Sequence, residues 1–226
     1  KRRYPGLQPF SVTERDLFFG REDDSEKLYK LINIKSLVVL YSKSGFGKSS
    51  LINAGLMPLL EKEGRMDTRT IRFTSFINEE QPTPLDVVAA KLPRLEDEAP
   101  DSRLGKLFAR VDSTRNRLWM QLKTHQMQEG AGEPLLLVFD QFEELFTYPD
   151  EQIDAFKARM DEVLQGTTPQ EITDLLEREM DNPSGQLDAS MVEELYKPLQ
   201  LKVIIAIRSD RLSLLDKLSD RLPYIL

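Results

Sequence analysis

The sequence contains no cysteine and a single histidine among its 226 residues. A chain without cysteine forms no disulfide framework, no thiolate zinc site and no thiol nucleophile, and one histidine leaves no histidine-based metal cluster. We therefore expect any chemistry of this protein to use lysine, arginine, carboxylates, hydroxyl groups and backbone amides.

Long hydrophobic runs are also missing. The longest apolar runs, at 135–139 and 203–207, are far shorter than the roughly 18 to 20 residues that a membrane-spanning helix needs. The first six residues are basic but lead into proline and glycine rather than into an apolar segment, so they do not have the pattern of a signal peptide. We expect no membrane partner and a cytoplasmic setting.

The charge is acidic overall but unevenly spread. Lysine and arginine number 31 against 38 aspartate and glutamate, for a net charge of −7. Residues 1–60 carry 10 basic and 6 acidic groups, whereas residues 131–226 carry 9 and 20. The basic first quarter suits an anionic ligand, although a solvated basic face explains the same excess. The acidic last segment argues against nucleic acid as a partner.

Hydrophobic spacing predicts alternating strands and helices. We expect strands at 37–41, 70–74, 135–139 and 203–207, and helices at 24–34, from 48 onward, and at 85–92, 102–128, 153–164, 172–180, 191–195 and 212–218. Gly55 and Pro58 should end or kink the helix that starts at Lys48. The run at 135–139 is apolar without alternation, which indicates a strand covered by helices on both faces. The expected fold is therefore α/β, with a mostly parallel sheet flanked by helices.

Single side chains on these helices carry simpler expectations. We expect Trp119 to pack in the core and His125 to lie on a solvated helix surface. The polar stretch at 181–185 should be a loop.

A glycine loop stands between the first strand and the helix that follows it. Glycine lets the backbone curl so that its amides point at phosphate oxygens, and the helix N-terminus adds partial positive charge. Lys48 would reach the β- and γ-phosphates, and the hydroxyl of Ser49 would bind Mg²⁺. The usual sequence pattern of a phosphate-binding loop has glycine at the position where this chain has Ser42. The residues that we expect to contact the nucleotide are Ser44, Gly45, Phe46, Gly47, Lys48, Ser49 and Ser50.

A second group of polar residues follows the buried strand at 135–139. Asp140 has the position and chemistry to hold Mg²⁺. Gln141 stands where many ATPases place a catalytic glutamate, and an amide cannot act as a base. Glu143 and Glu144 are therefore the candidates to deprotonate an attacking water. The alternative is an acidic helix N-terminus stabilised by the helix dipole.

Arg208 ends the fourth predicted strand, at the same ligand-binding edge of the sheet. Its guanidinium can read the γ-phosphate and stabilise charge during transfer. A pairing with Asp210 or another surface carboxylate explains the same residue without any ligand.

Several of these motifs, taken in order, resemble the STAND class of P-loop NTPases, which are relatives of NACHT, NB-ARC and AAA+ modules. The resemblance spans residues 4–212 and rests on the lead Tyr-Pro-Gly-Leu-Gln-Pro-Phe, on Leu-Phe-Phe-Gly-Arg-Glu at 17–22, on the P-loop, on Asp-Gln-Phe-Glu-Glu at 140–144 and on Ile-Arg at 207–208. It implies a three-layer P-loop NTPase fold of the ASCE/AAA+ type. It also implies that Phe19, Gly20 and Arg21 lie against the adenine.

The resemblance further implies a regulated switch. Such a protein binds ATP or ADP with Mg²⁺, hydrolyses ATP slowly, and forms homo-oligomers on activation of the full-length protein. Residues 1–35 would be a lead carrying the adenine-side motif, and residues 36–226 the NTPase core. The lid, sensor and effector domains would lie outside this chain, and in bacteria such effectors often serve antiviral defence.

Two other functions stay open from the sequence. A nucleotide-binding scaffold without turnover is compatible with Gln141 and Ser42, and an AAA+-type remodelling or DNA-associated ATPase is compatible with the motifs. The sequence does not distinguish ATP from GTP, nor Glu143 from Glu144 as the base.

Overall fold

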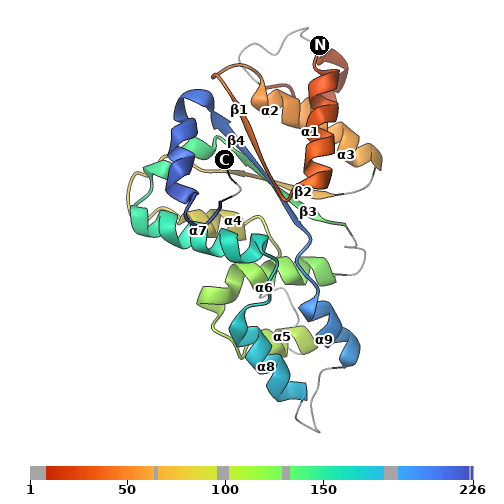
Figure 1. Cartoon of the computed structure of the whole chain (residues 1–226), viewed down its shortest axis with the longest axis vertical. Helices are drawn as coiled ribbons and strands as arrows, with labels where there is room; N and C mark the ends of the chain where they lie inside the picture. Colours follow the sequence, from red (N-terminus) through yellow and green to blue (C-terminus); the bar gives the residue numbers. More distant parts are fainter. Residues whose placement is uncertain are drawn as a thin grey trace.

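The computed structural model describes residues 9–63, 66–95, 102–128, 133–180, 188–223 and 225. At its centre these residues form a sheet of four parallel strands in the order β1-β4-β3-β2 (Figure 1). The strands are β1 (Leu37–Ser42), β2 (Asp67–Arg72), β3 (Leu135–Asp140) and β4 (Leu201–Arg208). Helices cover both faces of this sheet. The predicted α/β fold with a parallel sheet is confirmed.

The register of the strands brings their carboxyl ends to one edge of the sheet. Ser42 of β1 lies opposite Arg208 of β4, and Arg72 of β2 lies opposite Asp140 of β3. Open α/β sheets bind ligands outside this edge. The residues that end the four strands are therefore the first place to look for a site.

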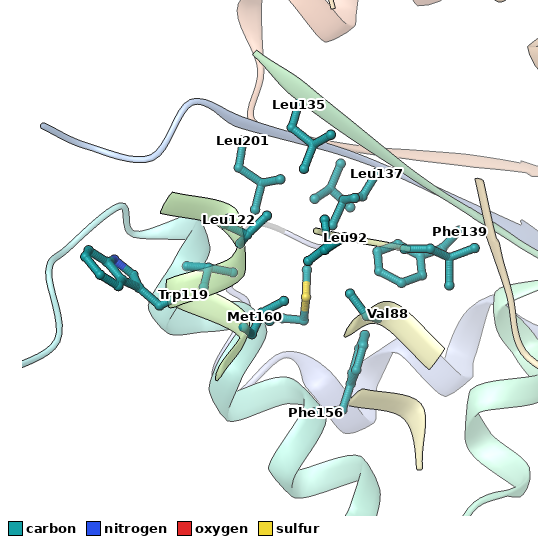
Figure 2. Packing of buried hydrophobic residues seen from close by; sticks show 14 of the residues in the cluster. Val88, Leu92, Trp119, Leu122, Leu135, Leu137, Phe139, Phe156, Met160 and Leu201 are labelled. Carbon is teal, nitrogen blue, oxygen red and sulfur yellow. The ribbon is translucent and has the colours of Figure 1, made fainter. Parts of the chain in front are cut away.

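Alternate residues of β1, β3 and β4 face two different cores. Val138 and Ile204 pack with α1 (Glu22–Ile34) and with the helix that follows β1. Leu137 and Phe139 face the larger core, where α4 (Pro84–Ala89), α6 (Ser113–Met127) and α7 (Asp150–Leu164) cover the sheet (Figure 2). All six residues of β3 are buried, which is why its sequence shows no polar alternation.

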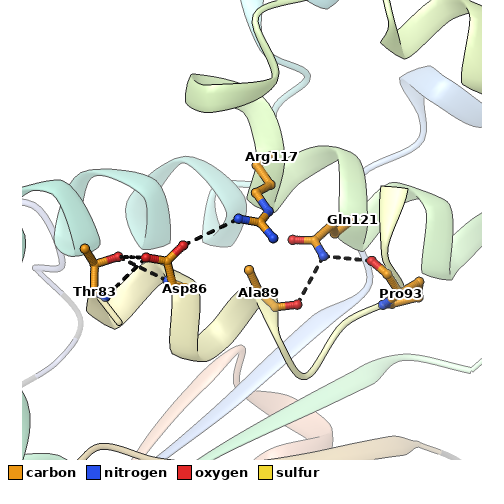
Figure 3. A network of polar contacts seen from close by, with 6 residues as sticks. All are labelled: Thr83, Asp86, Ala89, Pro93, Arg117 and Gln121. Carbon is orange, nitrogen blue, oxygen red and sulfur yellow. Dashed lines mark hydrogen bonds and ion pairs between the residues drawn. The ribbon is translucent and has the colours of Figure 1, made fainter. Parts of the chain in front are cut away.

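Polar contacts join α4 to α6 above the larger core (Figure 3). Thr83 caps α4 by accepting a hydrogen bond from the Asp86 amide at 3.2 Å. The Gln121 amide group on α6 donates to the carbonyls of Ala89 at 3.1 Å and Pro93 at 2.7 Å, at the end of α4. These bonds tie α6 to the last residue of α4 and to the segment that follows it.

A second layer of helices lies beyond α6 on the side away from the sheet (Figure 1). It contains α5 (Arg103–Phe108), α8 (Gln170–Met180) and α9 (Ala189–Tyr196). The fully buried Lys123 of α6 donates to the carbonyls of Glu194 at 2.9 Å and Lys197 at 2.6 Å, at the C-terminal end of α9. This ammonium also lies 5.6 Å from the centre of the Trp119 ring, which is buried in the core as predicted. Burial lowers the pKa of Lys123 to about 8.

The helix after the P-loop is longer than predicted. It runs through α2 (Lys48–Ser50), a π-helical turn η2 (Leu51–Leu56) and α3 (Met57–Glu63), so neither Gly55 nor Pro58 ends it. A Cβ atom at Gly55 would lie 2.2 Å from Ser25 Oγ of α1. The glycine therefore serves the close approach of α1 rather than a stop. Pro58 is the second residue after the π-helical turn inside this continuous helix, where its missing amide leaves one backbone hydrogen bond unmade.

The single helix predicted over 102–128 is wrong, because the chain forms α5 and α6 there. Ser102 accepts a hydrogen bond from the Gly105 amide at 2.9 Å and starts α5, and Asp112 accepts one from the Thr114 amide at 2.9 Å and starts α6. Leu107 of α5 and Leu118 of α6 pack in the same core. The apolar spacing therefore continues across the break and hides it.

Other boundaries shift by a few residues. Strand β2 begins and ends before the predicted 70–74, α4 ends before residue 92, and the residues at 181–185, expected to be a loop, lie outside the described residues.

The prediction that His125 is solvated is wrong. Its side chain is buried, with 7% exposure, and its Nε2 lies 3.5 Å from Asp67 Oδ2. The error arises because α6 is covered by the sheet on one side and by the second layer on the other. Among the described residues, no helix has the length and apolar character of a membrane span.

Candidate functional site

The P-loop lies between β1 and α2, as predicted. Gly45 and Gly47 both have φ of 77°, the left-handed region that glycine adopts without strain. A Cβ at Gly45 would meet nothing within 4 Å, so this position needs glycine for its backbone conformation and not for space. The curled loop then enters the helix through a hydrogen bond from the Leu51 amide to the Gly47 carbonyl at 2.8 Å.

Ser42 replaces the first glycine of the usual pattern without backbone strain. It is the last residue of β1, and among the described non-glycine residues only Gln141 has a positive φ. Lys48 Nζ donates to the Ser42 carbonyl at 3.1 Å. The lysine side chain thus folds back over the start of the loop. An anion bound there could replace the Ser42 carbonyl as the acceptor of the lysine's hydrogen bond.

The two residues predicted to bind the metal lie in direct contact. Ser49 Oγ donates to both carboxylate oxygens of Asp140, at 3.0 Å and 3.1 Å. This bond joins the first turn after the P-loop to the end of β3 across 91 residues of sequence. A hydroxyl and a carboxylate are the hard oxygen donors that Mg²⁺ prefers, so the donor set fits that ion. Among the described residues no group of three or more His, Asp or Glu side chains forms a metal site by itself.

Arg72 is a site residue that the sequence analysis missed. Its Nη2 forms an ion pair with Asp140 Oδ2. The predicted strand at 70–74 placed Arg72 in mid-strand, whereas β2 ends at this residue. The sequence signal that could have indicated this residue is an arginine within two residues of the predicted end of a strand. Its partner became visible only from the pairing of β2 with β3.

The chain turns sharply after Asp140. Gln141 has φ of 57° and ψ of 47°, a left-handed conformation that is uncommon for a residue with a side chain. The turn leads into the short helix η4 (Phe142–Thr147), which carries both candidate bases. Glu143 accepts a hydrogen bond from the Arg208 amide at 3.3 Å, and Glu144 accepts one from Ser75 Oγ at 2.5 Å. Glu143 is therefore oriented by the end of β4, and Glu144 by the segment that follows β2.

Arg208 lies at the cleft but pairs with its own neighbour. Its Nε and Nη2 donate to the two carboxylate oxygens of Asp210 at 3.1 Å and 2.7 Å. This pair raises the pKa of Arg208 and lowers the pKa of Asp210. This is the pairing that the sequence analysis gave as the explanation without a ligand, and the role of Arg208 toward a phosphate stays a prediction. Exposed pairs of this kind contribute little to stability, so the guanidinium can change partners at small cost.

The adenine-side motif is divided between the cleft and solvent. Phe19 is 75% exposed, and none of the three expected residues Phe19, Gly20 and Arg21 lines the cleft. Arg21 Nη1 donates to the Phe46 carbonyl of the P-loop at 3.4 Å. Phe10 and Phe18 line the cleft instead, with ring centres 5.8 Å apart. Sequence reasoning did not name either as a nucleotide contact, although each lies within a motif quoted for the resemblance.

Together these residues enclose a cleft of about 730 Å³ at the carboxyl edge of the sheet. Three cations, Lys48, Arg72 and Arg208, stand around three carboxylates on its wall. The volume lies within the range of small-molecule sites. The lining combines the predicted residues Ser44, Gly45, Phe46, Gly47, Lys48, Ser49, Ser50, Asp140, Glu143, Glu144 and Arg208 with Pro9, Phe10, Phe18, Arg72 and Gln141.

The lead segment is attached directly to the P-loop helix. The Phe10 amide donates to the buried Ser50 hydroxyl at 3.1 Å. Arg21 contacts the P-loop from the start of α1, and its Nε lies 2.6 Å from Asp24 Oδ2 in an ion pair. The lead and the P-loop therefore form one wall of the cleft.

Comparison with known proteins supports a nucleotide-binding protein of the P-loop NTPase kind. The family described as novel STAND NTPase 1 matches residues 4–222. No curated protein matches the chain. Four chains of known structure match. One is the ORC2 protein of Aeropyrum pernix, described as ADPNP-ADP complexes, at 13% identity and a TM-score of 0.45. The alignment covers 99% of this chain and 48% of that one, so this chain spans about half the length of that protein.

Proposed function

Since the chain belongs to the novel STAND NTPase 1 family, we propose that it binds ATP with Mg²⁺ in this cleft, hydrolyses it slowly, and acts as a signalling switch. The observation that carries the proposal is the hydrogen bond from Ser49 to Asp140. It joins the helix after a phosphate-binding loop to the acid that ends a central strand, which is the pair of oxygen donors that a magnesium nucleotide requires. ADP would occupy the same cleft after hydrolysis.

The chain's own residues can supply most of the binding and orientation. The amides of the P-loop and the partial charge of the helix N-terminus attract the phosphates. Lys48 exchanges the Ser42 carbonyl for phosphate oxygens. Ser49 and Asp140 would hold Mg²⁺, which when bound offsets the charge of the phosphates. Phe10 and Phe18 offer an apolar wall to the adenine ring of the nucleotide.

Proton transfer would fall to Glu143 or Glu144. Both line the cleft, and a carboxylate near the attacking water can orient it and accept its proton. Glu143 is bonded to the amide of Arg208, and Glu144 to the hydroxyl of Ser75. Arg208 would leave Asp210 to stabilise the charge that develops on the transferred phosphoryl group.

Signalling would follow from a difference in how two states of the protein bind nucleotide. Moving such an equilibrium from 1:99 to 99:1 needs about 5.5 kcal/mol of differential binding. We propose that sensor and effector domains of a longer protein supply that difference, and that its ATP form assembles into homo-oligomers. A cytoplasmic role in bacterial defence is part of the same proposal.

The first experiment measures nucleotide binding by isothermal titration calorimetry with ATP, ADP and GTP, with and without Mg²⁺. We expect Lys48→Ala to weaken magnesium ATP binding at least tenfold. The matched control is Lys62→Ala, which removes an exposed lysine from α3, outside the cleft. Equal affinity in the wild-type chain and Lys48→Ala would contradict the proposed binding mode.

The second experiment separates the switch from a scaffold that binds nucleotide without hydrolysis. The scaffold is favoured by Gln141, an amide at the position where a catalytic base often stands. Phosphate release is measured in the wild-type chain, Glu143→Gln and Glu144→Gln. We expect at least one variant to lose turnover. Wild-type rates in both variants would rule out the assigned bases, and binding without any release would favour the scaffold.

A further inference from the structure

Asp140 carries more hydrogen-bond and charge partners than its predicted role requires. Its Oδ2 accepts the Ser49 hydroxyl at 3.1 Å and also pairs with Arg72 Nη2, while Oδ1 accepts the same hydroxyl at 3.0 Å. The pairing is built into the sheet, because Arg72 and Asp140 are register partners at the ends of β2 and β3. The sheet register therefore places Arg72 beside this carboxylate.

The two partners of the ion pair differ in their exposure. The Asp140 side chain is 7% exposed, and that of Arg72 is 52% exposed. A carboxylate this buried needs a compensating charge. Among the described residues, Arg72 is the one cation within ion-pair distance of it. The guanidinium thus supplies the charge, and its exposure leaves it free to move away into the cleft.

A metal ion at this site would compete with Arg72. The carboxylate of Asp140 already accepts from two donors: the Ser49 hydroxyl, whose single proton is shared between both oxygens, and the Arg72 guanidinium. Ser49 is itself a prospective magnesium ligand, so its hydroxyl stays with the metal. Arg72 is the group that must leave, because its positive charge also repels the incoming cation.

We propose that Arg72 is the resident counter-cation of Asp140, and that Mg²⁺ must displace it. Arg72 thereby sets the Mg²⁺ concentration at which the cleft accepts a triphosphate. It acts as a positioning residue, since its ion pair holds the Asp140 carboxylate in place until the metal binds. This inference rests on the proposed nucleotide function and adds to it a Mg²⁺ concentration below which the magnesium-bound triphosphate does not bind.

The test titrates Mg²⁺ at a constant concentration of a fluorescent ATP analogue and follows binding by anisotropy. We expect Arg72→Gln to lower the half-saturating Mg²⁺ concentration about three- to tenfold, where tenfold corresponds to about 1.4 kcal/mol. Arg72→Lys keeps the positive charge and should stay within about twofold of wild type. The control is Arg69→Gln, which removes an arginine that pairs with Asp67 at 2.6 Å on the same strand, outside the cleft.

A second readout needs no nucleotide. Binding of Mn²⁺ to the protein alone, followed by its electron paramagnetic resonance signal, should be tighter in Arg72→Gln than in wild type. Thermal unfolding of each variant verifies that the chain is folded. An unchanged or higher metal requirement in Arg72→Gln would overturn the inference. If no variant binds the ATP analogue, the proposed function fails, and the Mn²⁺ affinities alone decide for or against Arg72 as the competing cation.

Discussion

Lys123 makes the stability of this protein depend on pH in the alkaline range. Its side chain is fully buried between α6 and the end of α9, where two carbonyls accept hydrogen bonds from its ammonium. Burial lowers its pKa to about 8, from an ordinary value of 10.5. We expect Lys123→Met, which keeps the length of the side chain and removes the charge, to abolish this pH dependence.

The sign and size of the effect follow from proton linkage. Between pH 8 and pH 10.5 the unfolded chain holds more protons at Lys123 than the folded chain does. The free energy of unfolding therefore rises with pH across this window, and the full cost of burying the charge is present below pH 8. Integrating the relation between pH 7 and pH 10 gives a gain of about 2.5 kcal/mol.

Urea unfolding at pH 7, 8, 9 and 10 measures this gain. The quantity to compare is the free energy of unfolding of the wild-type chain minus that of Lys123→Met at each pH. It should rise by about 2.5 kcal/mol over the range, because all other titrating groups cancel in the difference. The control Lys91→Met removes an exposed lysine and should give a flat difference. A flat difference for Lys123→Met as well would refute the reasoning.

Three further predictions concern the site and its support. Gly55→Ala would place a carbon atom 2.2 Å from Ser25 Oγ, so we expect urea unfolding to show a loss of about 1 to 3 kcal/mol, partly recovered when Ser25→Ala is added. Full stability of the single variant would contradict this packing. Asp140→Asn should weaken magnesium-dependent ATP binding at least tenfold and leave magnesium-free binding nearly unchanged in calorimetry; equal losses in both would argue against a metal role. Gln141→Val should be about 1 kcal/mol less stable than Gln141→Asn, since asparagine tolerates the left-handed backbone and a β-branched residue does not. Equal urea midpoints would show that the turn at Gln141 carries no strain.

Local features of the site could be predicted from the sequence because they depend on neighbouring residues. The strand, glycine loop and helix around Lys48 follow from hydrophobic runs and glycine positions within about 15 residues. The burial of β3 and β4 follows from their unbroken apolar composition. Asp140 and Arg208 were recognisable because each directly follows such a run.

Features that depend on packing between distant elements could not be predicted in this way. The break between α5 and α6 was hidden because both helices contribute to one core. The burial of Lys123 depends on the end of α9, and that of His125 on its place beside Asp67 at the start of β2. Helical spacing alone does not report how many layers cover a helix.

The amino-acid sequence by itself determined which chemical groups stand at the ends of the strands: a lysine and serine after β1, an aspartate after the apolar run of β3, an arginine after that of β4. Only the tertiary structure decided which of these groups meet. It paired Ser49 with Asp140 across 91 residues and Arg72 with the same carboxylate across 68. The reason is that neighbouring strands of this sheet are separated by helices in the sequence, so the residues of one strand do not show which strand lies beside it.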